Sequence, residues 1–442
     1  MTELNFCLRC SQELPKGRDL TDPSQIDTIQ SLAEEILSSD LDVATLKQIT
    51  FAKSTEWPVQ LLTAILTAES AAMLRACPVH HLTVIHAMYG EQDRIKPQAE
   101  CKSGQDFVRM KVKQISWLYN KFAPESSWNY IAVDDGCPNK SGDLMEAVIE
   151  KEGYKNVRVV RLQAGIDAKT PPFDQLTSTK DSRKGGAILY GLHTAAEEKS
   201  NKPHVAAYFD ADLSADLGLC GLLVHPILVD KKVVSVGQRY GCSGSFLALP
   251  HGADGHPVSL YNNTDCFRMI FRHFARGVLM PPLRPIYDTQ CAFKAIDVRC
   301  LPDIVKSINT FGPGFDMELL MVVGKLFTHI PEPFALVPFL FIEDKDGSTM
   351  SATDEAANKN FFAMLKEMIK THDRLFAHTA LSDDDKKWVQ FFRDMDQEGY
   401  TRIIVGITAK LGPTPVAALD TQFDLAEMQA MATGQSDTKQ ML

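Results

Sequence analysis

The feature that most constrains the fold is an alternation between short β-rich runs and helical stretches, which begins near residue 82. The strand-like runs are LTVIHAM, NYIAVDD, VRVVRL, HVAAYFD and KVVSVGQ, and the stretches 141–152, 185–199 and 216–229 between them have helical character. Such alternation places strands side by side and mostly parallel, with helices on both faces. We therefore predict an α/β fold built on a mostly parallel sheet flanked by helices.

Helical sequence lies on both sides of this region. Apolar residues recur at intervals of three and four over residues 24–76, and again in FFAMLKEMIKTHDRLF after residue 350. We predict a helical N-terminal extension over residues 1–78, a sheet domain over 79–350 and a helical C-terminal extension with a polar tail over 351–442. The extensions are candidates for pairing two copies of the chain into a homodimer.

Composition excludes several classes of protein. The chain has 442 residues and is 45% hydrophobic, which is enough for a large core, and its net charge of −10 argues against a nucleic-acid partner. It contains no uncharged apolar stretch of transmembrane length and no signal-peptide pattern, so we expect no transmembrane segment and a location in the cytoplasm or peripherally at a membrane. The ten cysteines, including Cys7 and Cys10 in a lone CxxC, are expected to be reduced thiols.

Polar residues follow three of the five expected strands. These clusters are Tyr89-Gly90-Glu91, Asp134-Asp135-Gly136 and Asp210-Ala211-Asp212. In open sheets of this kind, ligands bind at the carboxyl ends of the strands. The sequence therefore predicts one site assembled from separate strand ends.

Asp210 and Asp212 are the candidate metal ligands. Mg²⁺ or Mn²⁺ prefers a few carboxylates together with water and phosphate oxygens, so an Asp-x-Asp at a strand end suits a metal that also holds a diphosphate. The alternative is that these acids cap the next helix, a role that Asp216 is placed to take. His251 and His256, in a glycine-rich insertion, are candidates for further metal ligands.

Two other segments have features of a nucleotide site. Lys184 and Gly185 open a helix, where backbone N–H groups and the helix dipole favour an anion, although a plain turn into the helix is an equal alternative. Neither the P-loop nor the dinucleotide-binding glycine pattern is present. Asp134 and Asp135 have side chains able to accept hydrogen bonds from a nucleobase or a ribose, and loop capping is the alternative for them.

Taken in order, the segments resemble the family 2 glycosyltransferases of the GT-A fold over residues 82–350. IAVDDGCPNKSGDL is similar to the family's VDDGSTD segment, RKGGAILYGL to GKGGAxxxGL and AYFDADLS to its metal-binding DxD, while Gly90-Glu91-Gln92 stands in the place of an Asn-Glu-Glu turn. YDTQCAFKAI, GFDMELL and FLFIEDKDGSTM resemble the DTQCGFKxF, FDxELL and W-x-E-x-x-GSK signatures of the dolichyl-phosphate glucosyltransferase and mannosyltransferase branch.

The resemblance implies roles for individual residues. On the donor side it implies Asp210 and Asp212 on the metal, Asp134, Asp135 and Glu91 at the nucleoside, and Lys184 and Arg239 near the phosphates. On the acceptor side it implies Asp316 as the base, Asp288 and Gln290 beside the acceptor, and Lys294 facing an anionic acceptor. Asp316 as a helix N-cap, and Lys294 on a strand edge, are the alternatives.

The predicted function is metal-dependent transfer of a hexose from a nucleotide sugar, of UDP-glucose or GDP-mannose type, with inversion. Ala292 and Thr349 depart from the family signatures and a membrane segment is lacking, so the acceptor stays open between a polyprenyl phosphate and a soluble phosphate or hydroxyl compound. Three alternatives remain, namely a retaining transferase for a small anionic acceptor, a sugar-phosphate nucleotidyltransferase and a non-catalytic scaffold.

Overall fold

The computed structural model describes the chain except for residues 183, 240–241, 243, 249–269, 271, 281–282, 343–354, 378–380, 412–422 and 435–442. Within the described residues, no helix combines the length and the apolar character needed to cross a membrane.

The centre of the molecule is a seven-stranded sheet with the strand order β3-β2-β1-β4-β7-β5-β8. Neighbouring strands pair in parallel, except that β7 runs antiparallel to both β4 and β5. The strands are β1 (His81–Met88), β2 (Ser127–Asp134), β3 (Val157–Arg161), β4 (His204–Phe209), β5 (Val234–Gln238), β7 (Lys294–Asp297) and β8 (Phe334–Pro338). The predicted mostly parallel sheet is confirmed, and β6 (Phe246–Ala248) and β9 (Leu340–Ile342) form a separate parallel pair.

Alternate residues of the strands contribute to two different cores. In β4, Val205, Ala207 and Phe209 lie in the core on one face of the sheet, whereas Ala206 and Tyr208 lie in the core on the other face. Because the side-chain period of a strand is two, a sheet covered on both faces needs apolar residues at nearly every position, as β4 has.

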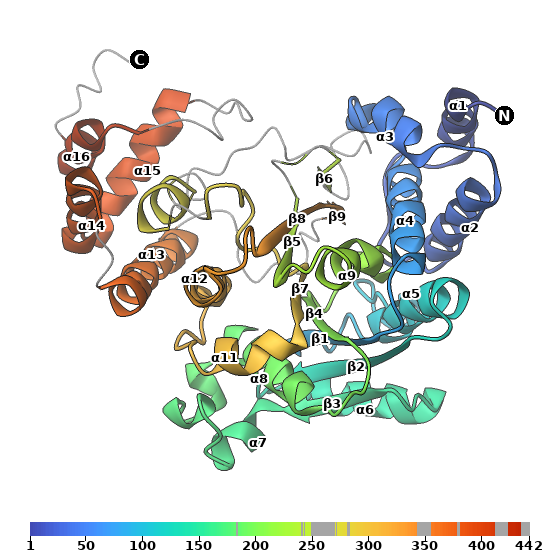
Figure 1. Cartoon of the computed structure of the whole chain (residues 1–442), viewed down its shortest axis with the longest axis horizontal. Coiled ribbons are helices and arrows are strands. Elements are labelled where there is room, and N and C mark those ends of the chain that lie inside the picture. The colour runs from blue at the N-terminus through green and yellow to red at the C-terminus, as the bar shows by residue number, and fades with distance from the viewer. Residues whose placement is uncertain are drawn as a thin grey trace.

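Helices cover both faces (Figure 1). The first core includes residues of α4 (Val59–Arg75), α5 (Phe107–Phe122), α6 (Ser141–Glu152) and α9 (Cys220–Leu228). The second includes residues of α7 (Leu162–Asp167), α8 (Lys184–Glu197), α11 (Leu301–Val305) and α12 (Phe315–Leu326). Short turns of helix lie at η1 (Ser54–Glu56), η2 (Phe173–Gln175), η3 (Thr179–Asp181), η4 (Leu217–Leu219), η6 (Arg272–Leu279, of π type) and η8 (Val298–Cys300).

The N-terminal extension is helical, as predicted. It consists of α1 (Glu3–Glu13), α2 (Ser24–Ser38) and α3 (Val43–Phe51), which form a third core together with α4. Cys7 and Cys10 lie in this core as free, buried thiols, and burial raises the pKa of Cys7 to about 12. The nine cysteines in the described part of the chain are all free.

A buried ion pair joins this extension to the sheet. Arg18 lies 3.2 Å from Asp216, and both side chains are less than 5% exposed. Asp216 also accepts a hydrogen bond from the Gly218 backbone N–H, which makes it the cap of η4, as expected. The extension therefore holds the loop that follows β4.

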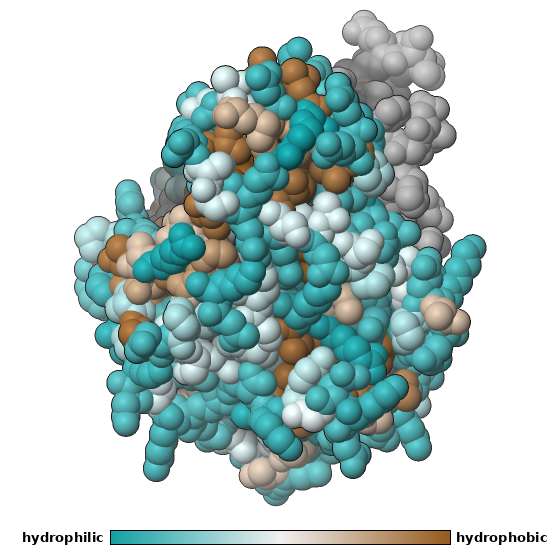
Figure 2. Space-filling view, turned by 90° about the vertical axis from the view of Figure 1, so that its right-hand side faces the viewer, coloured by the Kyte–Doolittle hydropathy of each residue, from teal (hydrophilic) through white to brown (hydrophobic). Residues whose placement is uncertain are grey.

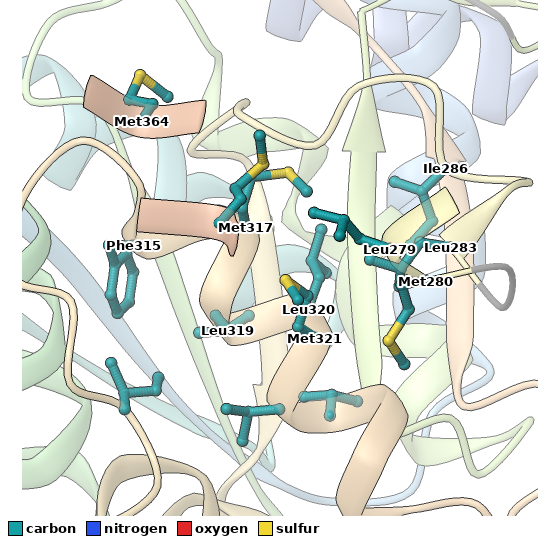
Figure 3. Close-up of a cluster of buried hydrophobic side chains, with 14 of the residues drawn as sticks. Leu279, Met280, Leu283, Ile286, Phe315, Met317, Leu319, Leu320, Met321 and Met364 are labelled. Carbon is teal, nitrogen blue, oxygen red and sulfur yellow. The ribbon is translucent and has the colours of Figure 1, made fainter. Parts of the chain in front are cut away.

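The C-terminal extension is also helical, with α13 (Glu355–Phe376), α14 (Asp383–Asp394), α15 (Gln397–Leu411) and α16 (Leu425–Thr433). Figure 3 shows side chains of α12, α13 and the 279–286 segment gathered in one cluster, where Met364 of α13 lies near Met317 of α12. The two extensions lie at opposite sides of the sheet in Figure 1. The exact domain boundaries stay a prediction.

Two connections are ordered by short helices and buried contacts. Residues 163–180 contain most of α7, all of η2 and the start of η3. Arg276, in η6, is 8% exposed, stacks on Tyr287 and donates to the backbone oxygen of Arg284. Residues 241–261 lie mostly outside the described residues.

The face covered by the N-terminal helices is mostly hydrophilic, with separate hydrophobic patches (Figure 2). Leu4 and Leu8 of α1 are about half exposed, at 50% and 47%.

Candidate functional site

Asp210 and Asp212 lie where β4 ends, in a turn fixed by its neighbours. The Asp212 carboxylate accepts from the Ser214 N–H at 3.0 Å, and the Gln105 side chain accepts from the Leu213 N–H at 2.9 Å. Asp216 provides the helix cap, and neither Asp210 nor Asp212 caps a helix among the described residues. Both carboxylates are half-buried.

The pKa values of the two acids are shifted in opposite directions. Burial, followed by repulsion from Asp210, raises the pKa of Asp212. Burial opposes ionisation of Asp210 too, but the ion pair with Lys184 outweighs it and lowers the pKa of Asp210. Two close carboxylates, one of them disfavoured as an anion, form a site that a cation would stabilise.

The donor set fits Mg²⁺ or Mn²⁺. Such ions take carboxylate and hydroxyl oxygens as ligands. Besides the two acids, the hydroxyl of Ser214 is buried and has no hydrogen-bond partner among the described residues. This unpartnered oxygen lies in the same turn as Asp212 and is available to a bound ion or to its water.

Two buried basic groups lie close enough to the acids to interact with them electrostatically. Lys111 of α5 is 1% exposed, and its ammonium has no hydrogen-bond partner among the described residues. Burial lowers the pKa of Lys111, and Asp212 and Asp210 oppose that shift. Burial likewise lowers the pKa of His86 of β1 to about 3. Sequence reasoning missed both residues, because each stands at an ordinary core position of its element.

The ends of β1 and β2 supply three more carboxylates. Glu91 pairs with Arg94 at 2.7 Å, and burial raises the pKa of Glu91. Asp134 accepts from the N–H groups of Cys137 at 2.8 Å and Gly142 at 3.2 Å, so it caps its own loop. This was the alternative considered for it.

Asp135 differs from its neighbour. It is 4% exposed, and its Oδ1 is buried with no hydrogen-bond partner among the described residues. Burial raises the pKa of Asp135 to about 7. Asp135 is thus the acid of this pair with an oxygen left for a ligand.

Lys184 and Gly185 open α8 as expected, but the glycines there are used for packing. A Cβ on Gly185 would lie 2.6 Å from Phe315 Cβ and 2.7 Å from the Gly312 oxygen. The Gly186 N–H donates to the Phe311 oxygen at 3.0 Å, so it is occupied. Lys184, whose side chain is 52% exposed, is the anion-binding candidate that remains.

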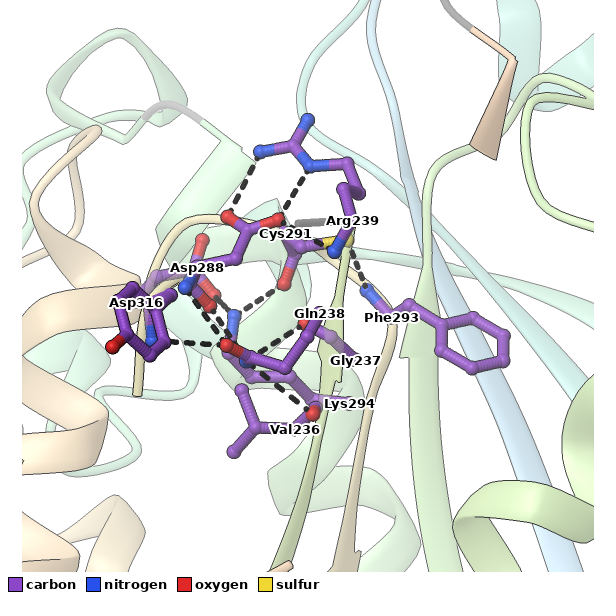
Figure 4. Close-up of polar contacts among 10 residues, drawn as sticks. Val236, Gly237, Gln238, Arg239, Asp288, Cys291, Phe293, Lys294 and Asp316 are labelled. Carbon is purple, nitrogen blue, oxygen red and sulfur yellow. Dashed lines mark hydrogen bonds and ion pairs between the residues drawn. The ribbon is translucent and has the colours of Figure 1, made fainter. Parts of the chain in front are cut away.

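Arg239 and Asp288 form a network at the end of β5 (Figure 4). Arg239 Nε lies 2.6 Å and Nη2 3.0 Å from the two oxygens of Asp288, whose side chain is fully buried. Gln238 accepts from the backbone N–H groups of Tyr287 and Asp288, each at 2.9 Å. The network fixes the 287–288 turn and the direction of Arg239.

Lys294 and Asp316 form an ion pair of 2.6 Å at the same edge of the sheet. Lys294 is fully buried, and Asp316 keeps 15% of its side chain exposed and accepts from the Tyr208 hydroxyl at 2.7 Å. Lys294 is therefore not on a strand edge, since β7 lies between β4 and β5. Asp316 is not the N-cap of α12, a position that Gly314 takes.

The structure brings some of the predicted site residues together around Asp210 and places others farther away. Lys184 interacts electrostatically with Asp210, Asp316 and Asp212, and Asp210 interacts with Arg239. Gln290 lies farther toward the C-terminal helices, with its amide 3.9 Å from the Met364 sulfur. His251 and His256 lie outside the described residues.

A cavity of about 940 Å³ is lined by residues of α3 and α4 together with Cys242, Gly244 and Ser245. None of its lining residues carries a predicted role.

No known protein family and no curated protein sequence matches this chain. Among solved structures, mannosyl-3-phosphoglycerate synthase from Rubrobacter xylanophilus is 12% identical, with a TM-score of 0.43 over 72% of this chain and 82% of that chain. Glucosyl-3-phosphoglycerate synthase from Mycobacterium tuberculosis, in complex with Mn²⁺, UDP and glucosyl-3-phosphoglycerate, is 14% identical, with a TM-score of 0.39 over 68% and 83%. A mannosyltransferase from Pyrobaculum calidifontis, in complex with GDP-Man and Mn²⁺, is 10% identical, with a TM-score of 0.36 over 93% of each chain. At these identities and TM-scores, the function has to be argued from the residues of this chain.

Proposed function

We propose that this protein is a metal-dependent glycosyltransferase that moves a hexose from a nucleotide sugar to a phosphate or hydroxyl acceptor with inversion. The observation that carries the proposal is the meeting of Asp210, Asp212 and Lys184 at one edge of the sheet. An acid pair beside an exposed ammonium matches the needs of a metal-bound diphosphate, which combines negative charge with oxygen ligands.

On the donor side, Asp210 and Asp212 would hold Mg²⁺ or Mn²⁺, which would offset the charge that develops on the departing diphosphate. Lys184 pairs with Asp210 in the structure described here. A cation bound to Asp210 would compete with that ion pair and free the Lys184 ammonium to reach a donor phosphate. Asp135, with its unpartnered oxygen, is the better candidate for the ribose or the base than Asp134.

On the acceptor side, Asp316 is our candidate for the base. Lys294 and the Tyr208 hydroxyl both donate to its Oδ1, which fixes the direction of the carboxylate, and the side chain stays 15% exposed, as a group that accepts a proton from a bound hydroxyl must be. A phosphate acceptor carries its own charge and would not need this step. Asp288 contacts Arg239 rather than open space, so we assign it the positioning of Arg239 and not a direct part in the reaction.

The test is ligand binding and slow donor hydrolysis with purified protein. UDP- and GDP-sugars, each with Mn²⁺, are screened for an increase in melting temperature, since a ligand at 100 times its Kd stabilises by about 2.7 kcal/mol. We expect one nucleotide to stabilise the protein only when the metal is present, and to be hydrolysed slowly.

Asp212→Asn should abolish both effects without unfolding the protein, whereas Asp174→Asn, at an exposed position of η2, should change neither. A fully active Asp212→Asn variant would overturn the metal assignment. Failure of every nucleotide sugar to bind would leave the non-catalytic scaffold as the better account.

A further inference from the structure

A second cluster of potential metal ligands lies at the opposite edge of the sheet. His81 and His204 are the first residues of β1 and β4 and stand directly opposite each other in register, and Glu198 follows α8. Asp210 comes just after the far end of β4. Six strand residues at about 3.3 Å each place the two ends of β4 roughly 20 Å apart. The cluster is therefore separate from the acid pair.

The three side chains converge on a common point. His81 Nε2 lies 3.8 Å and His204 Nε2 lies 3.9 Å from Glu198 Oε2, and the three ligand atoms lie within 4.8 Å of one another. Bonds of about 2.0–2.1 Å in a tetrahedral zinc site correspond to ligand atoms about 3.3 Å apart. Small side-chain adjustments would bring this group to that spacing.

Surrounding residues orient the candidate ligands. Ser127 Oγ lies 2.8 Å from His81 Nδ1, so a proton on Nδ1 donated to this hydroxyl leaves the Nε2 lone pair facing Glu198. Asn129 at 2.8 Å and Arg158 both donate to Glu198 Oε1, which leaves Oε2 directed at the two imidazoles. Hydrogen bonds of this kind to the far atom of each ligand are typical of metal sites.

Thr83 occupies the centre of the cluster. Its hydroxyl donates to Glu198 Oε2 at 2.9 Å and lies 2.8 Å from His204 Nε2. A metal ion would take over the His204 and Glu198 contacts of this hydroxyl.

We propose that His81 Nε2, His204 Nε2 and Glu198 Oε2 bind one Zn²⁺ ion, with water in the remaining position. The ligand set distinguishes this site from the acid pair, since imidazole ligands suit zinc whereas carboxylates and hydroxyls suit Mg²⁺ and Mn²⁺. Because the ligands join β1, β4 and the segment after α8, the ion would tie these elements together at the edge of the sheet remote from the donor site. This proposal does not depend on the proposed function.

The test uses the full chain, stripped of metal with a chelator and titrated with Zn²⁺ by calorimetry, with Co²⁺ as a spectroscopic substitute. We expect one Zn²⁺ per chain at this site, a rise in melting temperature, and visible Co²⁺ absorption of the kind given by a four- or five-coordinate nitrogen and oxygen site. His81→Gln should weaken Zn²⁺ binding by at least about tenfold, as loss of even a supporting hydrogen bond often does.

Two controls separate this site from others. His193→Gln changes a histidine that faces a glutamate, Glu197, at 3.5 Å without belonging to the cluster, and it should leave Zn²⁺ binding unchanged. An Asp210→Asn/Asp212→Asn variant should still bind Zn²⁺. Absence of saturable Zn²⁺ binding, binding that survives His81→Gln, or binding lost with the acid pair would each overturn the proposal.

If His81→Gln fails to fold, Ser127→Ala takes its place. This change removes only the partner of His81 Nδ1, and it should weaken Zn²⁺ binding by about tenfold while leaving the ligands in place. Unchanged Zn²⁺ affinity in that variant would count against the site.

Discussion

Single residues decide which of the predicted acids are available to a ligand. Asp134 and Asp135 are adjacent and both were predicted to contact a nucleoside, yet one is occupied by two backbone N–H groups and the other keeps an unpartnered oxygen. The sequence predicts two acids after a strand, but which one caps the loop depends on the path of the following turn. Lys111 lies on the buried face of α5, but the sequence does not show that this face brings its ammonium near Asp210 and Asp212.

Asp135 should make stability depend on pH. Its pKa of about 7 in the folded state exceeds its ordinary value near 4, so between these values the folded protein keeps a proton that the unfolded chain has released. The free energy of unfolding should therefore fall as pH rises through this window and stay level above about pH 7. Asp135→Asn removes this titration. Between pH 5 and pH 8 the free energy of unfolding of the variant should therefore rise by about 2 kcal/mol relative to that of the wild type.

Urea unfolding at the two pH values measures this difference. Asp40→Asn, at an exposed position, is the matched control and should follow the wild type at both. An Asp135→Asn variant that stays parallel to the wild type would show that burial does not raise this pKa.

Removing Asp316 and removing Lys294 should lower the stability of the protein by different amounts. Removing one partner of a buried pair leaves the other charge uncompensated, which costs about 3–5 kcal/mol in fully buried cases. Lys294 is fully buried whereas Asp316 is 15% exposed and keeps a contact with Tyr208. Asp316→Asn should therefore lower the free energy of unfolding more than Lys294→Met does. Urea unfolding of both variants and of the double variant tests this order, and the reverse order would refute it.

At the scale of elements, the close approach of α8 to the segment before α12 depends on Gly185. Alanine is a better helix former, so Gly185→Ala would stabilise a solvent-exposed helix by about 1 kcal/mol. Here the added methyl group would meet Phe315 Cβ and the Gly312 oxygen at less than 3 Å. We expect a net loss of about 1–3 kcal/mol, measured by urea unfolding. Gly312→Ala, whose nearest neighbour would be Glu367 at 3.5 Å, is the control expected to be close to neutral.

The helices and strands that could be predicted from the sequence are those in which the apolar residues recur with a clear period. The five strands from β1 to β5 and the helices α6, α8 and α9 were predicted to within a few residues, because their apolar runs are bounded by turns. The helices α5, between β1 and β2, and α7, between β3 and β4, were not predicted. β7 was not predicted, since Lys294–Asp297 is only four residues long and begins with a buried lysine. That strand is the one that carries Lys294 to the same edge of the sheet as Asp210, so the sequence alone could not place the two side by side.

At the scale of the whole molecule, the C-terminal helices should unfold together with the sheet. Phe392 of α14 is fully buried and contacts Phe274 and Trp388, within the core that also holds the strand residues Ala206 and Val236. Phe392→Ala should lower the free energy of unfolding by about 3–5 kcal/mol. The loss should shift a single transition, seen at the same midpoint by far-UV circular dichroism and by tryptophan fluorescence. Two separated transitions would show that the helices are an independent unit.

The Arg18–Asp216 contact has a practical consequence for anyone who shortens this protein. A version that begins at β1 would strip the guanidinium from a carboxylate that is 4% exposed and would leave an uncompensated negative charge only four residues from Asp212. The loop that follows Asp212 would also lose its contact with the N-terminal extension. An expression trial that trims the first helices as dispensable would be altering the surroundings of the proposed metal site, and Asp216→Asn is the compensating substitution to include from the start.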